Sequence, residues 1–89
     1  MVYILLGTGF EEMEAQTPCD LLRRGGEEVL LVSVGGKTVV GGHGIAVEAD
    51  LCLDETTPLP DMVVLPGGLG GVKSLWECRA AMDMVTAVC

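Results

Sequence analysis

Positively charged side chains are scarce in this sequence, and their scarcity limits what the chain binds. Five Lys and Arg stand against thirteen Asp and Glu, which gives a formal net charge of −8 at pH 7. Nucleic acids and anionic lipid surfaces are bound largely through positive charge on the protein. The composition therefore excludes nucleic-acid binding.

Long apolar runs are also missing. The longest cover residues 1–6, 29–32 and 62–65, whereas a membrane-spanning helix needs roughly 20 apolar residues. No basic stretch precedes the first run and no small-residue cleavage site follows it, so the pattern of a secretory signal is not met. We expect no membrane segment and a cytoplasmic location.

Patterns of metal ligands are lacking too. The sequence has one histidine, His43, and four cysteines that form no C-x-x-C pair. Zinc sites use closely spaced cysteines and histidines, so we expect no metal centre. Without an export signal, the cysteines are predicted to be reduced thiols rather than disulfides; they are Cys19, Cys52, Cys78 and Cys89.

The first 34 residues have the pattern of a strand, a helix and a second strand. Residues 2–6 and 28–34 are apolar and β-rich, which is typical of strands buried in a parallel sheet. Residues 8–11 fit a capping box and predict a helix starting near Gly9, with a kink or a break at Pro18. Gly25-Gly26 predicts its end. A βαβ crossover of this length indicates an α/β fold.

The rest of the chain predicts a small ribbon, a third strand and a last helix. Glycines bracket residues 37–40 and 45–49, which favours a ribbon at a sheet edge. Residues 61–65 are expected to form a third buried strand, and residues 72–89 one helix with Trp76 in the core. Three parallel strands leave one flank of the sheet open. We expect further strands, or a partner chain, to complete the sheet.

Two places could carry chemistry. Glu11, Glu12 and Glu14 follow the first strand, where ligands bind above a parallel sheet; a partly desolvated carboxyl there could stay protonated. The alternative is that these acids only favour the helix dipole. Gly67-Gly68 could direct backbone N–H groups at a developing oxyanion, or could simply form a tight turn.

Other motifs are weaker. Residues 67–74 nearly spell a phosphate-binding loop, but Val72 stands where that loop needs a glycine. Gly7-x-Gly9 lacks the third glycine of a dinucleotide fingerprint. His43 is interpreted as an exposed loop histidine.

Several motifs together carry a family resemblance. They are residues 2–6 (VYILL), 9–15 (GFEEMEA), Thr17-Pro18, 20–26 (DLLRRGG), 43–50 (HGIAVEAD) and 65–68 (LPGG). In this order, they make the sequence resemble the DJ-1/ThiJ/PfpI superfamily, and its DJ-1-like branch most closely.

The resemblance implies a fold and a site. The fold is a flavodoxin-like parallel-sheet sandwich, present only in part: β-α-β, a small edge ribbon, and β-α. The resemblance also implies a homodimer, no cofactor, and a reactive cysteine paired with a glutamate from the first helix. Glu14 is the matching glutamate, and Gly67 and Gly68 form the oxyanion pocket, with the Gly68 amide as the main donor.

The nucleophilic cysteine has no counterpart in this sequence. In the superfamily it lies on a strand-to-helix elbow well after the L-P-G-G turn, whereas Cys89 continues the helical pattern that starts at Val72. Cys19 and Cys52 stand at positions that the superfamily does not use for catalysis. We therefore expect the nucleophile beyond residue 89, and we interpret residues 1–89 as the N-terminal part of one DJ-1/PfpI-like domain.

These expectations leave several functions open. The first is glyoxalase or deglycase chemistry on a small reactive carbonyl compound, with hydrolase or amidase chemistry and a thiazole-biosynthesis (ThiJ) role as further labels of the superfamily. The second is a non-catalytic redox sensor or chaperone-like dimer, in which protonated Glu14 bonds to an oxidised cysteine. Phosphate binding at residues 67–74 is the third.

Overall fold

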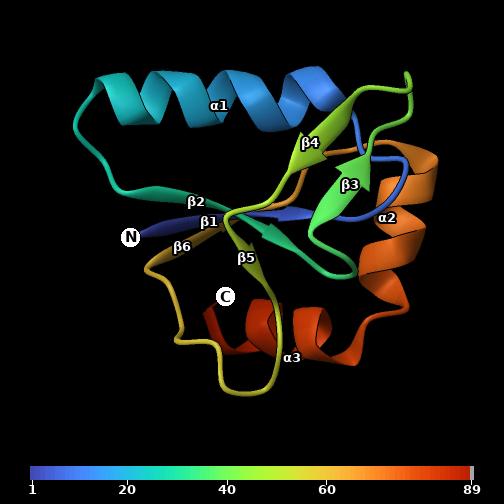
Figure 1. Ribbon diagram of the computed structural model, residues 1–89. Helices are drawn as coiled ribbons and strands as arrows, with labels where there is room; N and C mark the ends of the chain where they lie inside the picture. Colours follow the sequence, from blue (N-terminus) through green and yellow to red (C-terminus); the bar gives the residue numbers. More distant parts are fainter. Residues whose placement is uncertain (89) are drawn as a thin grey trace.

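A four-stranded parallel sheet forms the centre of the molecule (Figure 1). A computed structural model describes residues 1–88. The strands are β1 (Val2–Leu6), β2 (Val29–Ser33), β5 (Leu51–Cys52) and β6 (Met62–Val64), in the order β5-β2-β1-β6. Ile4 of β1 pairs with Leu31 of β2 on one side and Val64 of β6 on the other. The α/β class expected from the sequence is confirmed.

Helices cover both faces of this sheet. Helix α1 (Glu12–Arg24) lies on one face, and α2 (Leu69–Trp76) and α3 (Arg79–Val88) lie on the other (Figure 1). Alternate residues of β1 serve the two cores: Ile4 packs with Ala15 of α1, and Leu5 packs with Leu75 of α2. This alternation explains why β1 is apolar throughout.

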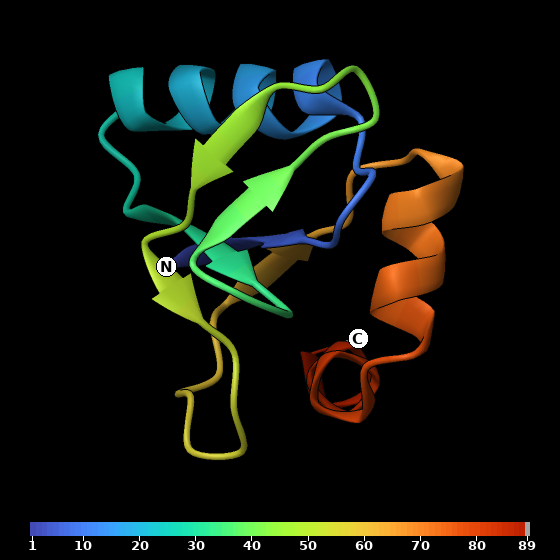
Figure 2. The ribbon, with the colours of Figure 1, turned by 45° about the vertical axis from the view of Figure 1, so that its right-hand side comes forward.

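A separate antiparallel ribbon joins the α1 face. It consists of β3 (Thr38–Val40) and β4 (Ala46–Glu48), as the bracketing glycines predicted. Val39 and Val47 pack into the same core cluster as Ala15. Figure 2 shows the ribbon beside α1, with its connecting loop near the start of that helix. The ribbon thus reaches the carboxyl end of β1.

Helix α1 differs from the expectation at its start and at Pro18. It begins at Glu12, and its cap is the Glu11 side chain, which accepts a hydrogen bond from the Met13 N–H at 3.3 Å. The predicted capping box is wrong because Gly9 has a φ of +90° and belongs to a turn. The helix also continues through Pro18 without a break. Burial of Ala15 and Cys19 against the sheet supports this continuity.

The predicted last helix is in fact two helices. Helix α2 ends at Trp76 and α3 starts at Arg79, which turns Ala81 and Met84 under the sheet. Trp76 is 72% exposed, so its predicted place in the core is wrong. The predicted helical cysteine, Cys89, lies outside the described residues. Within residues 1–88, no helix is long and apolar enough to cross a membrane.

The strand count also differs from the expectation. The two-residue strand β5 was not predicted, because Leu51 and Cys52 are too short a segment to show a period. Strand β6 forms an edge of the described sheet, and Met62 is 47% exposed rather than buried. Its outer side has no strand partner within residues 1–88.

We expect Gly71→Ala to destabilise the fold. A Cβ atom at Gly71 would lie 2.6 Å from the Phe10 Cα, which is backbone and cannot rotate away. Overpacking of this kind costs about 1–3 kcal/mol, more than the roughly 1 kcal/mol of helix propensity that alanine adds. Urea unfolding measures the loss. Gly36→Ala is the control, because no atom lies within 4 Å of its added Cβ; equal stability of the two variants would contradict the tight contact.

Candidate functional site

Two turns meet at the carboxyl edge of the sheet. One follows β1 (residues 7–11) and the other follows β6 (residues 65–68) and leads into α2. Gly68 has a φ of +96°, and a Cβ atom there would lie 2.6 Å from the Gly9 carbonyl oxygen. Only glycine allows this approach and this backbone angle. The glycines after β6 are therefore required for one backbone to pack directly on the other.

Glu14 reaches the second turn from the first turn of α1. Its Oε1 accepts a hydrogen bond from the Gly67 N–H at 2.6 Å. The Gly67 carbonyl in turn accepts a hydrogen bond from the Glu11 N–H at 2.8 Å. The start of α1 therefore bonds to both the N–H and the carbonyl of Gly67. The structure brings Glu14 to the Gly67–Gly68 turn, although Glu14 and Gly67 are 53 positions apart in the sequence.

Gly68 differs from Gly67 in its hydrogen bonding. It is the N-cap residue of α2, and its carbonyl accepts the Val72 N–H at 2.9 Å. Among the described residues, none accepts a hydrogen bond from the Gly68 N–H. This amide, at the positive end of a helix, is able to donate to an anionic group.

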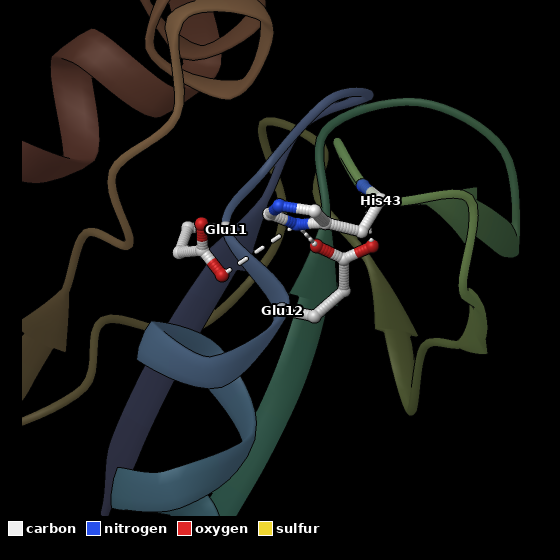
Figure 3. Close-up of side chains that lie close together, drawn as sticks. All are labelled: Glu11, Glu12 and His43. Atoms are coloured by element: carbon white, nitrogen blue, oxygen red, sulfur yellow. Dashed lines mark hydrogen bonds and ion pairs between the residues drawn. The ribbon is translucent and has the colours of Figure 1, made fainter.

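Glu12 forms a second polar cluster, on the ribbon side of α1 (Figure 3). Its Oε2 accepts the His43 N–H at 2.8 Å and the Ile45 N–H at 3.2 Å, and its Oε1 lies 3.0 Å from His43 Nδ1. The Glu12 side chain is only 7% exposed, whereas that of His43 is 70% exposed. Glu12 therefore does more than favour the helix dipole: it holds the ribbon loop.

In this cluster, Glu12 and His43 each stabilise the charged form of the other. Burial alone would raise the pKa of Glu12, but the hydrogen bonds from the His43 side chain and from backbone N–H groups outweigh it and lower the pKa to about 2. The hydrogen bond with Glu12 raises the pKa of His43, and the nearby Glu11 carboxylate adds to this. Sequence reasoning missed the pair, because nothing in the sequence links residues 31 positions apart.

Glu11, Glu12 and His43 also have the donor types of a metal site. Their ligand atoms lie within 4.8 Å of one another. Both oxygens of Glu12 are already engaged, with two backbone N–H groups and the imidazole. Hydrogen bonding alone accounts for this arrangement. A hollow of about 530 Å³ lies beside the cluster, with Met13, Gln16, Thr17 and Ile45 also in its wall.

Comparison with known proteins identifies the family. The sequence matches the DJ-1/PfpI family over residues 1–89. The chain belongs to this family. It is 41% identical to Protein DJ-1 homolog A of Arabidopsis thaliana over 86 residues, which covers 94% of this chain and 22% of that protein. It is 40% identical to Deglycase TK1284 of Thermococcus kodakarensis over 68 residues, which covers 75% of this chain and 41% of that protein.

A solved structure confirms the fold. The C103A mutant of the DJ-1 superfamily protein STM1931 from Salmonella typhimurium superposes with a TM-score of 0.92 at 38% identity. The match covers 98% of this chain and 48% of that one. The chain thus spans about half the length of this relative and less than half the length of the two curated relatives above. It corresponds to the N-terminal half of the DJ-1/PfpI fold.

The described cysteines of this DJ-1/PfpI chain take no part in the contact between Glu14 and Gly67. Cys19 is buried on α1, Cys52 is exposed on β5, and Cys78 is partly buried between α2 and α3. Burial raises the pKa of the Cys19 thiol, which makes it a poorer nucleophile at neutral pH. None of the three makes a hydrogen bond to Glu14 or to the Gly67–Gly68 turn.

The phosphate-binding alternative loses support in the structure. Gly70, Gly71 and Val72 lie within α2 rather than in an open loop. Gly70 and Gly71 pack against residues 8–10, which leaves no room for a phosphate between the two turns. Ser74 Oγ, the position of the hydroxyl in such loops, donates to carbonyls of Thr8 and Gly70 instead.

The contribution of the Glu12–His43 pair to stability should be greatest between about pH 4.5 and 6.5. Glu12 has a folded pKa of about 2 against an ordinary 4.5, so its contribution is present above pH 4.5 and lost as the pH falls towards 2. His43 has a raised folded pKa, so its contribution is present below 6.5 and lost as the pH rises through that pKa. Urea unfolding of the protein and of His43→Ala, from about pH 2 to well above pH 6.5, gives the difference. A difference independent of pH would contradict the ion pair.

Proposed function

We propose that this chain supplies the glutamate and the backbone donor of a cysteine–glutamate site that acts on small reactive carbonyl compounds, as in glyoxalase or deglycase chemistry. The observation that carries the proposal is the 2.6 Å hydrogen bond from the Gly67 N–H to Glu14 Oε1. It holds a carboxyl group beside a turn whose next amide, that of Gly68, is available to a ligand. Relatives named deglycases in Thermococcus and Pyrococcus support this chemistry.

The geometry gives the residues different roles. A cysteine thiolate that attacks a carbonyl carbon forms a C–S bond and moves the π electron pair onto the oxygen. The Gly68 N–H is the donor for that oxyanion. Gly67 uses its own N–H to orient Glu14, which takes up and returns the proton. Gly67 is therefore a positioning residue in this proposal, and Glu14 a general acid–base.

The cysteine comes from outside residues 1–89, in a continuation of the chain or in a partner. Among residues 1–88, no strand pairs with the outer edge of β6, and beside this edge lies an apolar hollow of about 250 Å³ whose wall includes Leu65, Val72 and Trp76. A parallel strand added at this edge would end at the same side of the sheet as Gly67. Residues that follow such a strand would lie near Glu14. The greater length of the relatives supports this source.

A second function uses the same residues without turnover. In a redox-sensing or chaperone-like homodimer, Glu14 would donate a hydrogen bond to an oxidised cysteine instead of moving a proton during catalysis. The Glu14–Gly67 contact fits this role equally, because it orients the carboxyl group in both cases. Turnover of a carbonyl substrate separates the two functions.

We expect Glu14→Gln to lower methylglyoxal turnover by about 100-fold or more, because glutamine keeps the shape but cannot transfer the proton. The loss should appear in kcat for methylglyoxal consumption, measured with the whole protein carrying the substitution. Glu55→Gln is the matched control, since Glu55 is exposed and lies on the loop between β5 and β6. Equal turnover in both variants would refute the catalytic role of Glu14. No turnover in the unsubstituted protein would favour the redox-sensing dimer.

Substitution of Cys19, Cys52 or Cys78 by alanine should leave methylglyoxal turnover unchanged, because none of these thiols lies in the site. Alkylation of the unsubstituted protein with iodoacetamide should nevertheless abolish it, and peptide mapping should place the inactivating label on a cysteine other than Cys19, Cys52, Cys78 and Cys89. An intact mass well above 9.3 kDa would identify a continuation of the chain as its source; a mass at that value would point to a partner. Loss of turnover in one of the three variants would overturn the assignment.

A further inference from the structure

We propose that Glu12 is a positioning residue for the Glu14–Gly67–Gly68 site and that it acts through the tip of the ribbon. This inference rests on the proposed function for its effect on turnover, but not for its effect on the conformation of the Gly67 turn. Two facts about Glu12, its burial and the direction of its carboxylate, support it. This residue is the one buried acid among the described residues, yet its carboxylate faces the ribbon and not the site.

The first step is from Glu12 to the ribbon tip. Its carboxylate accepts the N–H groups of His43 and Ile45, which are two of the backbone donors of the loop between β3 and β4. Gly41 packs so closely that an added Cβ atom would overlap the carboxylate. His43 Nδ1 completes the contact from the exposed side (Figure 3). The loop is thus folded around one buried charge, and removal of that charge would leave two backbone donors without an acceptor.

The second step is from the ribbon to the turn after β1. The Gly42 N–H donates to the Phe10 carbonyl at 2.8 Å, and the Gly9 N–H donates to the Val40 carbonyl at 2.8 Å. These two bonds attach the β3 side of the ribbon tip to residues 9–10. A shift of the tip therefore displaces this turn directly.

The third step is from that turn to the site. The Glu11 N–H donates to the Gly67 carbonyl, and the Gly68 Cα lies against the Gly9 carbonyl, with no side chain between them. Backbone atoms in such contact cannot absorb a displacement by changing rotamers. The orientation of the Gly67–Gly68 peptide, and with it the donor direction of the Gly68 N–H, thus depends on where the ribbon holds residues 9–11.

Amide hydrogen exchange of Gly67 and Gly68, followed by NMR in the protein as isolated, tests this dependence. We expect Glu12→Ala to speed exchange of the Gly67 N–H by about tenfold or more. The reason is that Glu14, which accepts the hydrogen bond from this N–H, is no longer held in position. Exchange at Ile4 and Leu5 in the centre of the sheet should stay slow, which shows that the fold is intact. Glu12→Gln should restore the protection of Gly67, because its amide oxygen still accepts both backbone bonds.

The control is Glu48→Gln, which removes the exposed ion pair between Glu48 of the ribbon and Lys37; among the described residues, the Glu48 carboxylate bonds to no residue of α1. It should leave Gly67 unchanged. If Glu12→Ala does not fold, His43→Ala replaces it: this variant keeps the backbone bonds, and we expect a smaller increase in Gly67 exchange. Faster exchange at Gly42 and Ile45 with no change at Gly67, in either variant, overturns the inference.

Kinetics separate this inference from the proposed function. With a functional site, Glu12→Ala should lower kcat for methylglyoxal more than it changes KM, and Glu12→Gln should recover most of kcat. If the unsubstituted protein has no turnover, the proposed function fails while the exchange data still decide the inference. If turnover is present and Gly67 exchange does not respond to Glu12, the inference fails and the proposed function stands.

Discussion

The direct backbone contact between the turns after β1 and β6 is the constraint on which the rest of the site depends. The Glu11 N–H bonds to the Gly67 carbonyl at 2.8 Å, and Gly68 lies against Gly9 so closely that any side chain would collide. Because these strands are adjacent and parallel, their carboxyl ends meet at one edge. The contact fixes the Gly67 peptide, and the Gly67 N–H in turn fixes Glu14.

Three adjacent or near-adjacent acids at the start of α1 serve three different purposes. Glu11 caps the helix, Glu12 holds the ribbon loop, and Glu14 bonds to the Gly67 amide. Glu11 precedes the helix with extended backbone, whereas Glu12 and Glu14 point to different sides because successive helical residues lie about 100° apart around the axis. A general preference for negative charge at a helix N-terminus therefore describes the cluster only in part.

The open edge of β6 and the apolar wall around Trp76 are consistent with the partial coverage of the relatives. The chain aligns over 98% of its length with a DJ-1 superfamily structure, but with only 48% of that structure. Its own residues provide the centre of the sheet, and in the proposed site they provide Glu14 and the Gly67–Gly68 amides. In the proposed function, a nucleophile supplied at the β6 edge completes the site that Glu14 and the Gly67–Gly68 turn begin.

The sequence by itself determined the class of fold, the positions of β1 and β2, and the end of α1, because apolar runs and the Gly25-Gly26 stop are local signals. The resemblance also singled out Glu14, Gly67 and Gly68, and in the structure Glu14 accepts a hydrogen bond from the Gly67 N–H. Only the tertiary structure decided that Trp76 is exposed, that the last helix breaks before Arg79, and that Glu12 pairs with His43. These features depend on packing between segments far apart in the chain, and no local propensity encodes such packing.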